Sequence, residues 1–306
     1  MQNAPDGFDV LARFPRATDV TLSPQYLSFA TGSSVSVMDR ASGATRFQLK
    51  GLKFAYSVLI HPDETLLVVY GTSPYILFYR LPDGKLLKKL KLPTTQSQDV
   101  EAAMDASGFL WFPMHTDDLC SVLLKINLNT LEVEERLFEG QGLCIHRIQK
   151  ATDSGWLLFG FSRMPEPREP RHWIARFSGS GAVFRPIFGP EPGSNDPLGL
   201  MAYDQANRVF CHINRDFELI QVEEDTGVCQ KTALNLGAEE YPTALALDGR
   251  FRYLATTERL MILDRKLLGE WPMEFGFLKL RALGDGLLMA APFSKGAMLI
   301  QCNFPG

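Results

Sequence analysis

Short runs of apolar residues alternate with polar turns along the whole chain. Each of seven such runs follows a turn rich in the Gly, Pro, Asp, Asn and Ser residues that favour tight hairpins. No window sustains the i, i+3, i+4, i+7 spacing of an amphipathic helix. The pattern therefore predicts an all-β chain. Its buried strands are expected at residues 26–30, 65–70, 109–113, 156–161, 208–212, 251–255 and 287–291.

The strand pattern repeats. The turns recur at intervals of 36 to 52 residues, the length of a four-stranded propeller blade. The second repeat shows the whole unit, with expected strands at 57–60, 65–70, 75–79 and 85–92, which we call a, b, c and d from the centre outward. The sequence thus predicts a seven-bladed β-propeller of four-stranded antiparallel blades, formed by residues 1–306 as a single domain.

The two ends of the chain complement each other. The last repeat stops after its third strand, at 297–302, and an unassigned strand-like segment lies at 8–14, before the first repeat. Pairing the two would hide two open sheet edges, which otherwise promote aggregation. We therefore expect the N-terminal strand to complete the last blade and to close the ring.

Two stretches carry a family resemblance. One begins with Leu22-Ser23-Pro24 and ends with Ser42-Gly43, and the other runs from His61-Pro62-Asp63 to Pro82-Asp83-Gly84. They resemble the bacterial WD40-like and YVTN-type propellers, although the Gly-His and Trp-Asp dipeptides of true WD40 repeats are missing. The resemblance implies a propeller that acts as a scaffold, and it transfers no catalytic residue.

Composition narrows the choice of partners. Hydrophobic residues make up 45% and charged residues 22% of the chain, as in a folded protein, and the net charge of -4 offers no basic surface for nucleic acid. No apolar stretch reaches the roughly 18 residues that cross a membrane, and residues 1–9 do not form a signal peptide. The five cysteines lack CxxC spacing and are expected to be reduced core thiols. We expect a cytoplasmic monomer that binds neither nucleic acid nor membrane.

Loop length distinguishes the two ends of the blades. The b–c and d–a connections are longer than the a–b and c–d turns, and their end of the blades is called the long-loop face. Binding residues concentrate on loops that a rigid scaffold holds. Residues 163–172 contain three prolines and are expected to project as an irregular arm. The partner-binding candidates on this face are His115, Asp117, Asp118, Arg163, Arg168, Arg171, His172, Glu191, Asp196, Glu239, Glu240 and Tyr241.

A second group of candidates lies where inner strands begin. Tyr56, Asp99, Glu101 and His146 are expected near the mouth of the central channel. No nucleophile elbow, phosphate-binding glycine loop or metal-ligand spacing occurs, so we predict no catalytic residue, metal or cofactor. The favoured function is a non-catalytic scaffold for a protein partner, such as a regulator, an assembly factor or a toxin-neutralising protein. The alternative is a propeller-type hydrolase or lactonase, with a divalent ion held at the channel mouth by Glu101, His146 and neighbouring acids.

Overall fold

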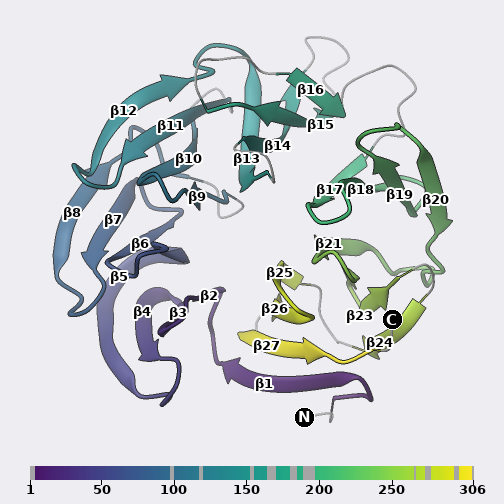
Figure 1. Cartoon of the computed structure of the whole chain (residues 1–306), viewed down its shortest axis with the longest axis horizontal. Coiled ribbons are helices and arrows are strands. Elements are labelled where there is room, and N and C mark those ends of the chain that lie inside the picture. The colour runs from purple at the N-terminus through teal and green to yellow at the C-terminus, as the bar shows by residue number, and fades with distance from the viewer. Residues whose placement is uncertain are drawn as a thin grey trace. The chain divides into compact units, whose positions relative to one another are not determined.

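Antiparallel β-strands build the chain (Figure 1). The computed structural model describes residues 4–96, 100–116, 120–151, 155–163, 170–179, 185–188, 197–264, 267–272, 277–292 and 296–304. These ranges contain no α-helix, and hence no helix long and apolar enough to cross a membrane. The predicted all-β class is confirmed.

The strands belong to two compact units. The middle unit comprises Thr18–Pro192, and the terminal unit comprises Met1–Ala17 together with Gly193–Gly306. Each unit holds its own antiparallel sheets and its own apolar clusters.

The middle unit contains three sheets. Their strand orders are β2-β3-β4-β5-β6-β7-β8, β12-β11-β10-β9 and β13-β14-β15-β16. The strands are β2 (Asp19–Leu22), β3 (Tyr26–Ala30), β4 (Gly32–Asp39), β5 (Thr45–Ile60), β6 (Leu66–Gly71), β7 (Tyr75–Arg80), β8 (Leu86–Lys91), β9 (Ala103–Met104), β10 (Phe109–His115), β11 (Ser121–Asn127), β12 (Glu132–Leu137), β13 (Leu143–Lys150), β14 (Trp156–Arg163), β15 (Pro170–Phe177) and β16 (Arg185–Phe188).

Strand β5 joins the first two repeats into one sheet. The sequence predicts a separate strand at 57–60, but β5 begins at Thr45 and continues to Ile60, pairing first with β4 and then with β6. Gly51 and Phe54 have φ values of 72° and 59°, so the strand turns between its two halves, where the ladder to β4 is interrupted between Lys50 and Ala55. The d–a connection is too short here to form a loop.

The terminal unit also contains three sheets, ordered β17-β18-β19-β20, β21-β22-β23-β24 and β1-β27-β26-β25. The strands are β1 (Phe8–Phe14), β17 (Pro197–Asp204), β18 (Val209–Asn214), β19 (Glu218–Glu223), β20 (Cys229–Ala233), β21 (Pro242–Leu247), β22 (Arg252–Thr256), β23 (Arg259–Leu263), β24 (Leu267–Pro272), β25 (Phe277–Gly284), β26 (Leu287–Pro292) and β27 (Ala297–Cys302).

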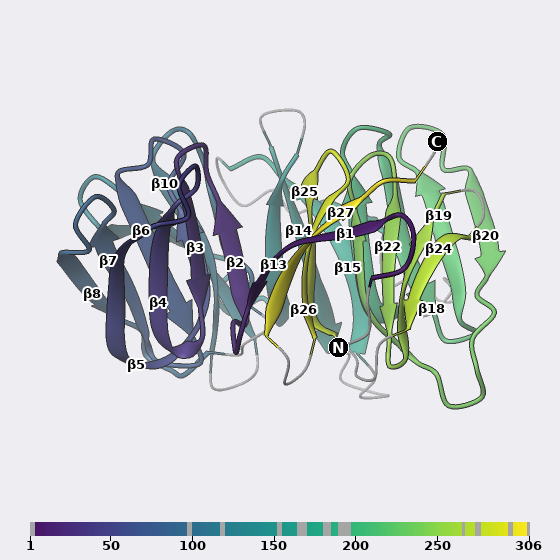
Figure 2. The same cartoon turned by 90° about the horizontal axis from the view of Figure 1, so that it is seen from below.

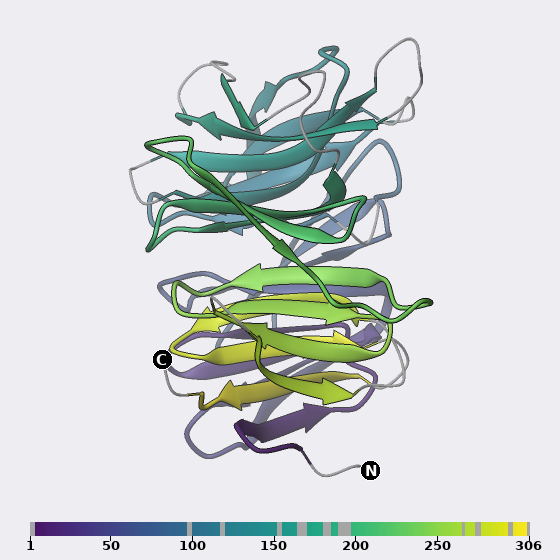
Figure 3. The ribbon, with the colours of Figure 1, turned by 90° about the vertical axis from the view of Figure 1, so that its right-hand side faces the viewer.

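The N-terminal strand completes the last sheet. β1 lies antiparallel to β27 from the Phe8–Cys302 pair to the Phe14–Ala297 pair, and Figures 2 and 3 show the purple β1 beside the yellow β27. Phe8 is buried against Trp271 and Phe304, with ring centroids 5.7 and 5.0 Å away. This one-plus-three arrangement is the strand pairing that the sequence predicts.

Apolar clusters lie between neighbouring sheets of the same unit. One joins Trp111 to Trp156 and Phe177 across the sheets of β9–β12 and β13–β16, and another packs Ile213 with Leu254 between the sheets of β17–β20 and β21–β24. Fully burying one such side chain contributes about 1.5–3 kcal/mol. Face-to-face packing of twisted antiparallel sheets thus supplies the core of each unit.

Aspartates fix the tight a–b turns that the sequence predicts. The Asp63, Asp105, Asp204 and Asp248 carboxylates accept backbone N–H groups of their own turns, for example Phe109 N–H at 2.9 Å and Phe251 N–H at 2.7 Å. Asp105 also accepts the Trp111 indole N–H at 3.0 Å. These local bonds set the register of the inner hairpins.

The cysteines are all free, as the sequence predicts, but they are not all core residues. Cys144, Cys211 and Cys302 are buried, Cys120 is half-buried and Cys229 is exposed. Burial raises the pKa values of Cys211 and Cys302 to about 12, so both thiols stay protonated. Cys229 lies on β20, the last strand of its sheet.

Candidate functional site

The predicted arm at 163–172 is shorter than the sequence suggests. Strands β14 and β15 pair up to Arg163 opposite Pro170, and His172 lies opposite Phe161 with ring centroids 5.7 Å apart. Arg171 and His172 are thus ladder residues, because a proline at the first position of a strand interrupts no pairing. Strand β17 also begins with a proline, Pro197. Arg168, Glu191, Asp196, Asp99, Asp117 and Asp118 lie outside the described residues.

Two channel-mouth candidates of the middle unit are neighbours. The Glu101 N–H donates to the His146 carbonyl at 2.8 Å, and the Ile148 N–H donates to the Glu101 carbonyl at 3.1 Å. These bonds form a parallel bridge between Glu101 and Arg147. Arg147 belongs to β13, the first strand of the adjoining sheet. Tyr56 lies elsewhere in this unit, on β5, where its ring is 6.5 Å from that of Phe54.

The His146 ring is held neutral. Loss of solvent around it, reinforced by the Arg147 charge and opposed by Glu101, lowers the pKa of His146 to about 3. His115 and His172 are close enough to act on it in the same direction as Arg147. Within the described ranges, no group of three or more His, Cys, Asp or Glu side chains is placed to hold a metal ion.

His115 joins strands together. Its backbone N–H donates to the Gln96 side chain at 2.7 Å, and its carbonyl accepts the Thr94 hydroxyl at 2.5 Å. Its ring Nε2 lies 3.3 Å from the Ile145 carbonyl of β13, which also accepts the Ser121 hydroxyl. These contacts tie the end of β10 to the connection between β8 and β9 and to the neighbouring sheet.

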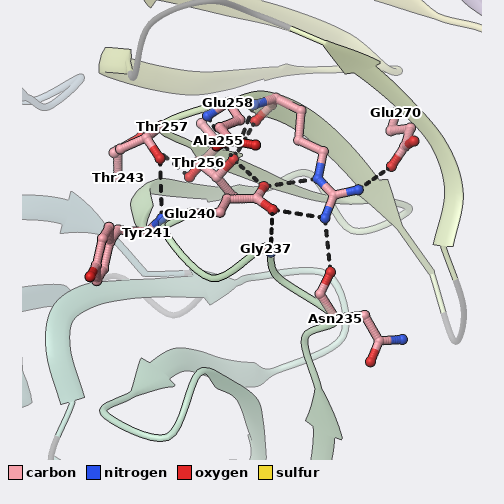
Figure 4. Close-up of polar contacts among 11 residues, drawn as sticks. Asn235, Gly237, Glu240, Tyr241, Thr243, Ala255, Thr256, Thr257, Glu258 and Glu270 are labelled. Atoms are coloured by element: carbon pink, nitrogen blue, oxygen red, sulfur yellow. Dashed lines mark hydrogen bonds and ion pairs between the residues drawn. The ribbon is translucent and has the colours of Figure 1, made fainter.

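Glu240, predicted to face a partner, is instead a buried structural residue of the terminal unit. It is 3% exposed, and both carboxylate oxygens are occupied: Oε1 accepts the Thr256 hydroxyl at 2.5 Å, and Oε2 accepts the Gly237 N–H at 2.9 Å (Figure 4). Arg259 donates to both, from Nε at 2.8 Å and from Nη2 at 2.9 Å. The carboxylate therefore fixes the β20–β21 connection to the turn between β22 and β23.

Arg259 is the hub of this network. Besides the bidentate pair with Glu240, it donates to Glu270 of β24 at 2.6 Å and to the Asn235 carbonyl at 2.8 Å. Guanidinium geometry suits such a planar fork. Sequence reasoning missed Arg259 because it lies 19 residues from Glu240 and has no local motif.

Tyr241 follows Glu240 in the chain, and Thr257 holds its backbone. Its N–H donates to the Thr257 hydroxyl at 3.2 Å and its carbonyl accepts the Thr257 N–H at 2.9 Å, so its backbone is fixed at both ends. The side chain is 55% exposed, and Figure 4 shows it directed away from the Glu240 carboxylate. A large aromatic residue on a fixed backbone binds a partner at little entropic cost.

An aromatic pair bridges two sheets at this point. The Tyr241 ring meets the half-buried Phe217 ring edge-on at 5.8 Å, and Phe217 belongs to the β18–β19 connection. The acidic residues Asp216, Glu239 and Glu258 are exposed on these connections. We call Phe217, Tyr241 and these three acidic residues the aromatic-acidic patch. It lies on b–c and d–a connections, as expected of the long-loop face.

The Glu240 network makes stability depend on pH. Burial alone raises its pKa, but hydrogen bonds from Arg259, Thr256 and Gly237 outweigh this effect, so the pKa of Glu240 is below its usual value of 4.5. Its contribution to the free energy of unfolding is complete above about pH 4.5 and is lost as the pH falls through the lower folded value. We expect the urea midpoint of the wild type to fall more between pH 6 and pH 3 than that of Glu240→Gln. Parallel falls in urea titrations would contradict this role.

Comparison with known proteins defines the class of fold. No family model and no curated protein matches the chain. The β-propeller domain of Myceliophteria thermophila Cps50 (Swd1) is similar in structure, with a TM-score of 0.70 and 12% identity over 96% of this chain and 99% of that one. Kuenenia stuttgartiensis hydrazine synthase gives a TM-score of 0.72 and 13% identity over 97% and 98%. The chain therefore has a β-propeller fold, and identities this low show the fold alone.

Proposed function

We propose that this chain is a non-catalytic, seven-bladed propeller scaffold that binds one specific protein partner through its long-loop face. In this proposal the two halves of the β2–β8 sheet and the five four-stranded sheets are the seven blades and β1 closes the ring. The strand order of the sheets and the pairing of β1 with β27 support it. A regulator, an assembly factor or a toxin-neutralising protein fits this description, acting as a monomer in the cytoplasm. The Cps50 (Swd1) propeller domain makes a scaffold role reasonable by analogy of fold.

The observation that carries the proposal is the fixed, outward Tyr241. Tyr is enriched in the energetically dominant positions of interfaces because it adds a large contact area with few rotatable bonds. Here two hydrogen bonds to Thr257, one to its hydroxyl and one from its N–H, hold the Tyr241 backbone, and a buried ion pair with Arg259 fixes the preceding residue, Glu240. Burying the Glu240 carboxylate costs desolvation free energy. We expect this cost where the position of Tyr241 serves a function.

The chemistry of the patch defines the partner. Tyr241 and the edge of Phe217 offer an apolar contact, and Asp216, Glu239 and Glu258 surround it with negative charge. A complementary surface has an apolar pocket for the Tyr241 ring and basic residues around it. Exposed charges of this kind act mainly on the association rate, so binding should weaken as salt rises.

Replacing Tyr241 tests the proposal. Truncation of a central aromatic contact costs about 2 kcal/mol or more, which is about a 30-fold loss of affinity. We expect Tyr241→Ala to bind the partner captured from the source cell at least this much more weakly, while its melting temperature stays close to that of the wild type. Capture with both proteins, quantified by mass spectrometry and then by titration, measures the difference.

Leu267→Ala is the matched control. Leu267 is 45% exposed and begins β24, at the opposite end of the same sheet from Tyr241. The Leu267→Ala variant should bind the partner as tightly as the wild type does. Equal affinities for the wild type and Tyr241→Ala would remove the aromatic-acidic patch from the interface.

A further inference from the structure

A polar groove separates two sheets of the terminal unit, at the end opposite to the aromatic-acidic patch. It has a volume of about 740 Å³ and lies between β19 and β20 on one side and Arg252 and Asp264 on the other. Gln221 and Gln230 are directly paired across β19 and β20 and both line it, as does Thr232. Its walls thus present amide and hydroxyl groups that form hydrogen bonds with a polar ligand.

Strand β20 borders this groove with an open edge. It is the last strand of its sheet, all five of its residues are exposed, and only β19 pairs with it among the described residues (Figure 1). The Glu223 N–H donates to the Val228 carbonyl and the Leu234 N–H donates to the Phe217 carbonyl. Because antiparallel pairs alternate, residues 228, 230, 232 and 234 direct their backbone groups toward β19. The N–H and C=O groups of Cys229, Lys231 and Ala233 therefore point to the open edge.

This edge carries fewer of the residues that usually block strand addition than the other outer strands do. Charged residues and proline protect edges, and outer strands elsewhere carry them: three lysines on β8, three glutamates and an arginine on β12, and Glu270 with Pro272 on β24. β20 has the sequence CQKTA, with one lysine and no proline. The Lys231 Nζ forms an ion pair with Glu218 Oε2 at 3.8 Å, so its charge at the edge is partly neutralised.

We propose that the β20 edge and the adjoining groove bind an extended peptide segment by strand addition. Residues that pair opposite Gln230 and Thr232 would project on their side of the sheet, toward the groove. The groove lining contains five carboxylates and three guanidinium groups, a net charge of -2, and Glu223 and Asp225 are exposed in it. The segment therefore has basic side chains at every second position.

A second copy of this chain fits the edge less well. Two β20 strands paired about a two-fold axis through their shared open residues would place Lys231 opposite Lys231 of the other copy. Like charges directly opposite each other destabilise a ladder. A heterologous basic segment avoids this repulsion and meets the acidic groove.

A peptide of alternating lysine and threonine is the probe. A fluorescent decapeptide (Lys-Thr)5 is titrated into the full chain at low salt. The control is a decapeptide of the same composition in which pairs of lysines alternate with pairs of threonines. The alternating peptide is expected to bind at least 10-fold more tightly, because only alternation puts every lysine on one face of a strand. Equal affinities would mean that only the total charge of the peptide determines binding, and they would overturn the proposal.

Two variants at one position separate the backbone from the side chain. Lys231→Pro removes the open N–H without touching the ladder to β19, and Lys231→Thr removes the charge and keeps the N–H. Lys231→Thr should bind the alternating peptide as well as the wild type does, and Lys231→Pro at least 10-fold more weakly. Unchanged binding by Lys231→Pro contradicts strand addition.

Hydrogen exchange on the wild type keeps the test independent of the folding of Lys231→Pro. The alternating peptide should slow amide exchange within 229–233 and leave 234–241 unchanged, which also separates this site from the aromatic-acidic patch. Slowing at 234–241 without slowing at 229–233 would place the peptide on the other site. Sedimentation showing a wild-type dimer that Lys231→Pro abolishes would assign the edge to a second copy.

Discussion

Removing residues 1–15 is expected to lower the melting temperature by at least about 10 °C and to promote association. The deletion removes β1, and with it the buried Phe8 and Phe14. Truncating one buried Phe costs about 3–5 kcal/mol, and the two together approach the whole stability of a typical domain, about 5–15 kcal/mol. The deletion also leaves β27 as an open edge. Thermal melting followed by circular dichroism, with sedimentation, measures both effects.

Point variants on the same strand provide the control. Phe8→Ala should show a large part of the loss, because its ring packs on Trp271 and Phe304. Leu11→Ala changes a residue of β1 that is 60% exposed, and it should differ from the wild type by less than about 1 kcal/mol. A truncated protein that stays monomeric and melts within a degree or two of the full chain would exclude closure by β1.

Glu240→Gln is expected to destabilise the terminal unit by about 3–5 kcal/mol, the cost of leaving one partner of a buried ion pair without its counter-charge. The neutral glutamine would leave the Arg259 guanidinium without the carboxylate that accepts two of its hydrogen bonds. Urea unfolding gives the difference in free energy. The same variant should weaken partner binding, because the backbone of Tyr241 lies next to the lost contact.

Glu270→Gln is the matched control for that prediction. It removes the other carboxylate that Arg259 contacts, at 2.6 Å, but the Glu270 side chain is 43% exposed. Exposed ion pairs contribute at most about 1 kcal/mol. Equal losses for the two variants would mean that burial of Glu240 has no special role.

Much of the fold could be predicted because its signals are local. The segments at 8–14, 26–30 and 297–302 match β1, β3 and β27 residue by residue, because each is a mainly apolar run bounded by turn residues. The Asp-containing turns were recognisable for the same reason. The continuous β5 could not be predicted, because Lys50, Gly51 and Lys53 interrupt the apolar pattern and only the pairing partners show that one strand spans both halves.

The candidate site depended on long-range facts. Residues 239–241 were predicted as a polar loop for a partner, and Glu239 and Tyr241 are indeed exposed while Glu240 is buried. Nothing local distinguishes the two glutamates, because the difference is made by Arg259 and Thr256 on the next hairpin. The β20 edge was likewise invisible, since an open edge is defined by a strand that is missing beside it.

Hydrogen exchange on the captured partner complex tests the central proposal most directly. We expect slower exchange in the connections 214–218, 234–241 and 256–259, which carry or support the aromatic-acidic patch. The turns at 204–208 and 248–252, at the other end of the same sheets, should exchange as in the free protein. Protection confined to those turns, with the three connections unchanged, would contradict binding through the long-loop face.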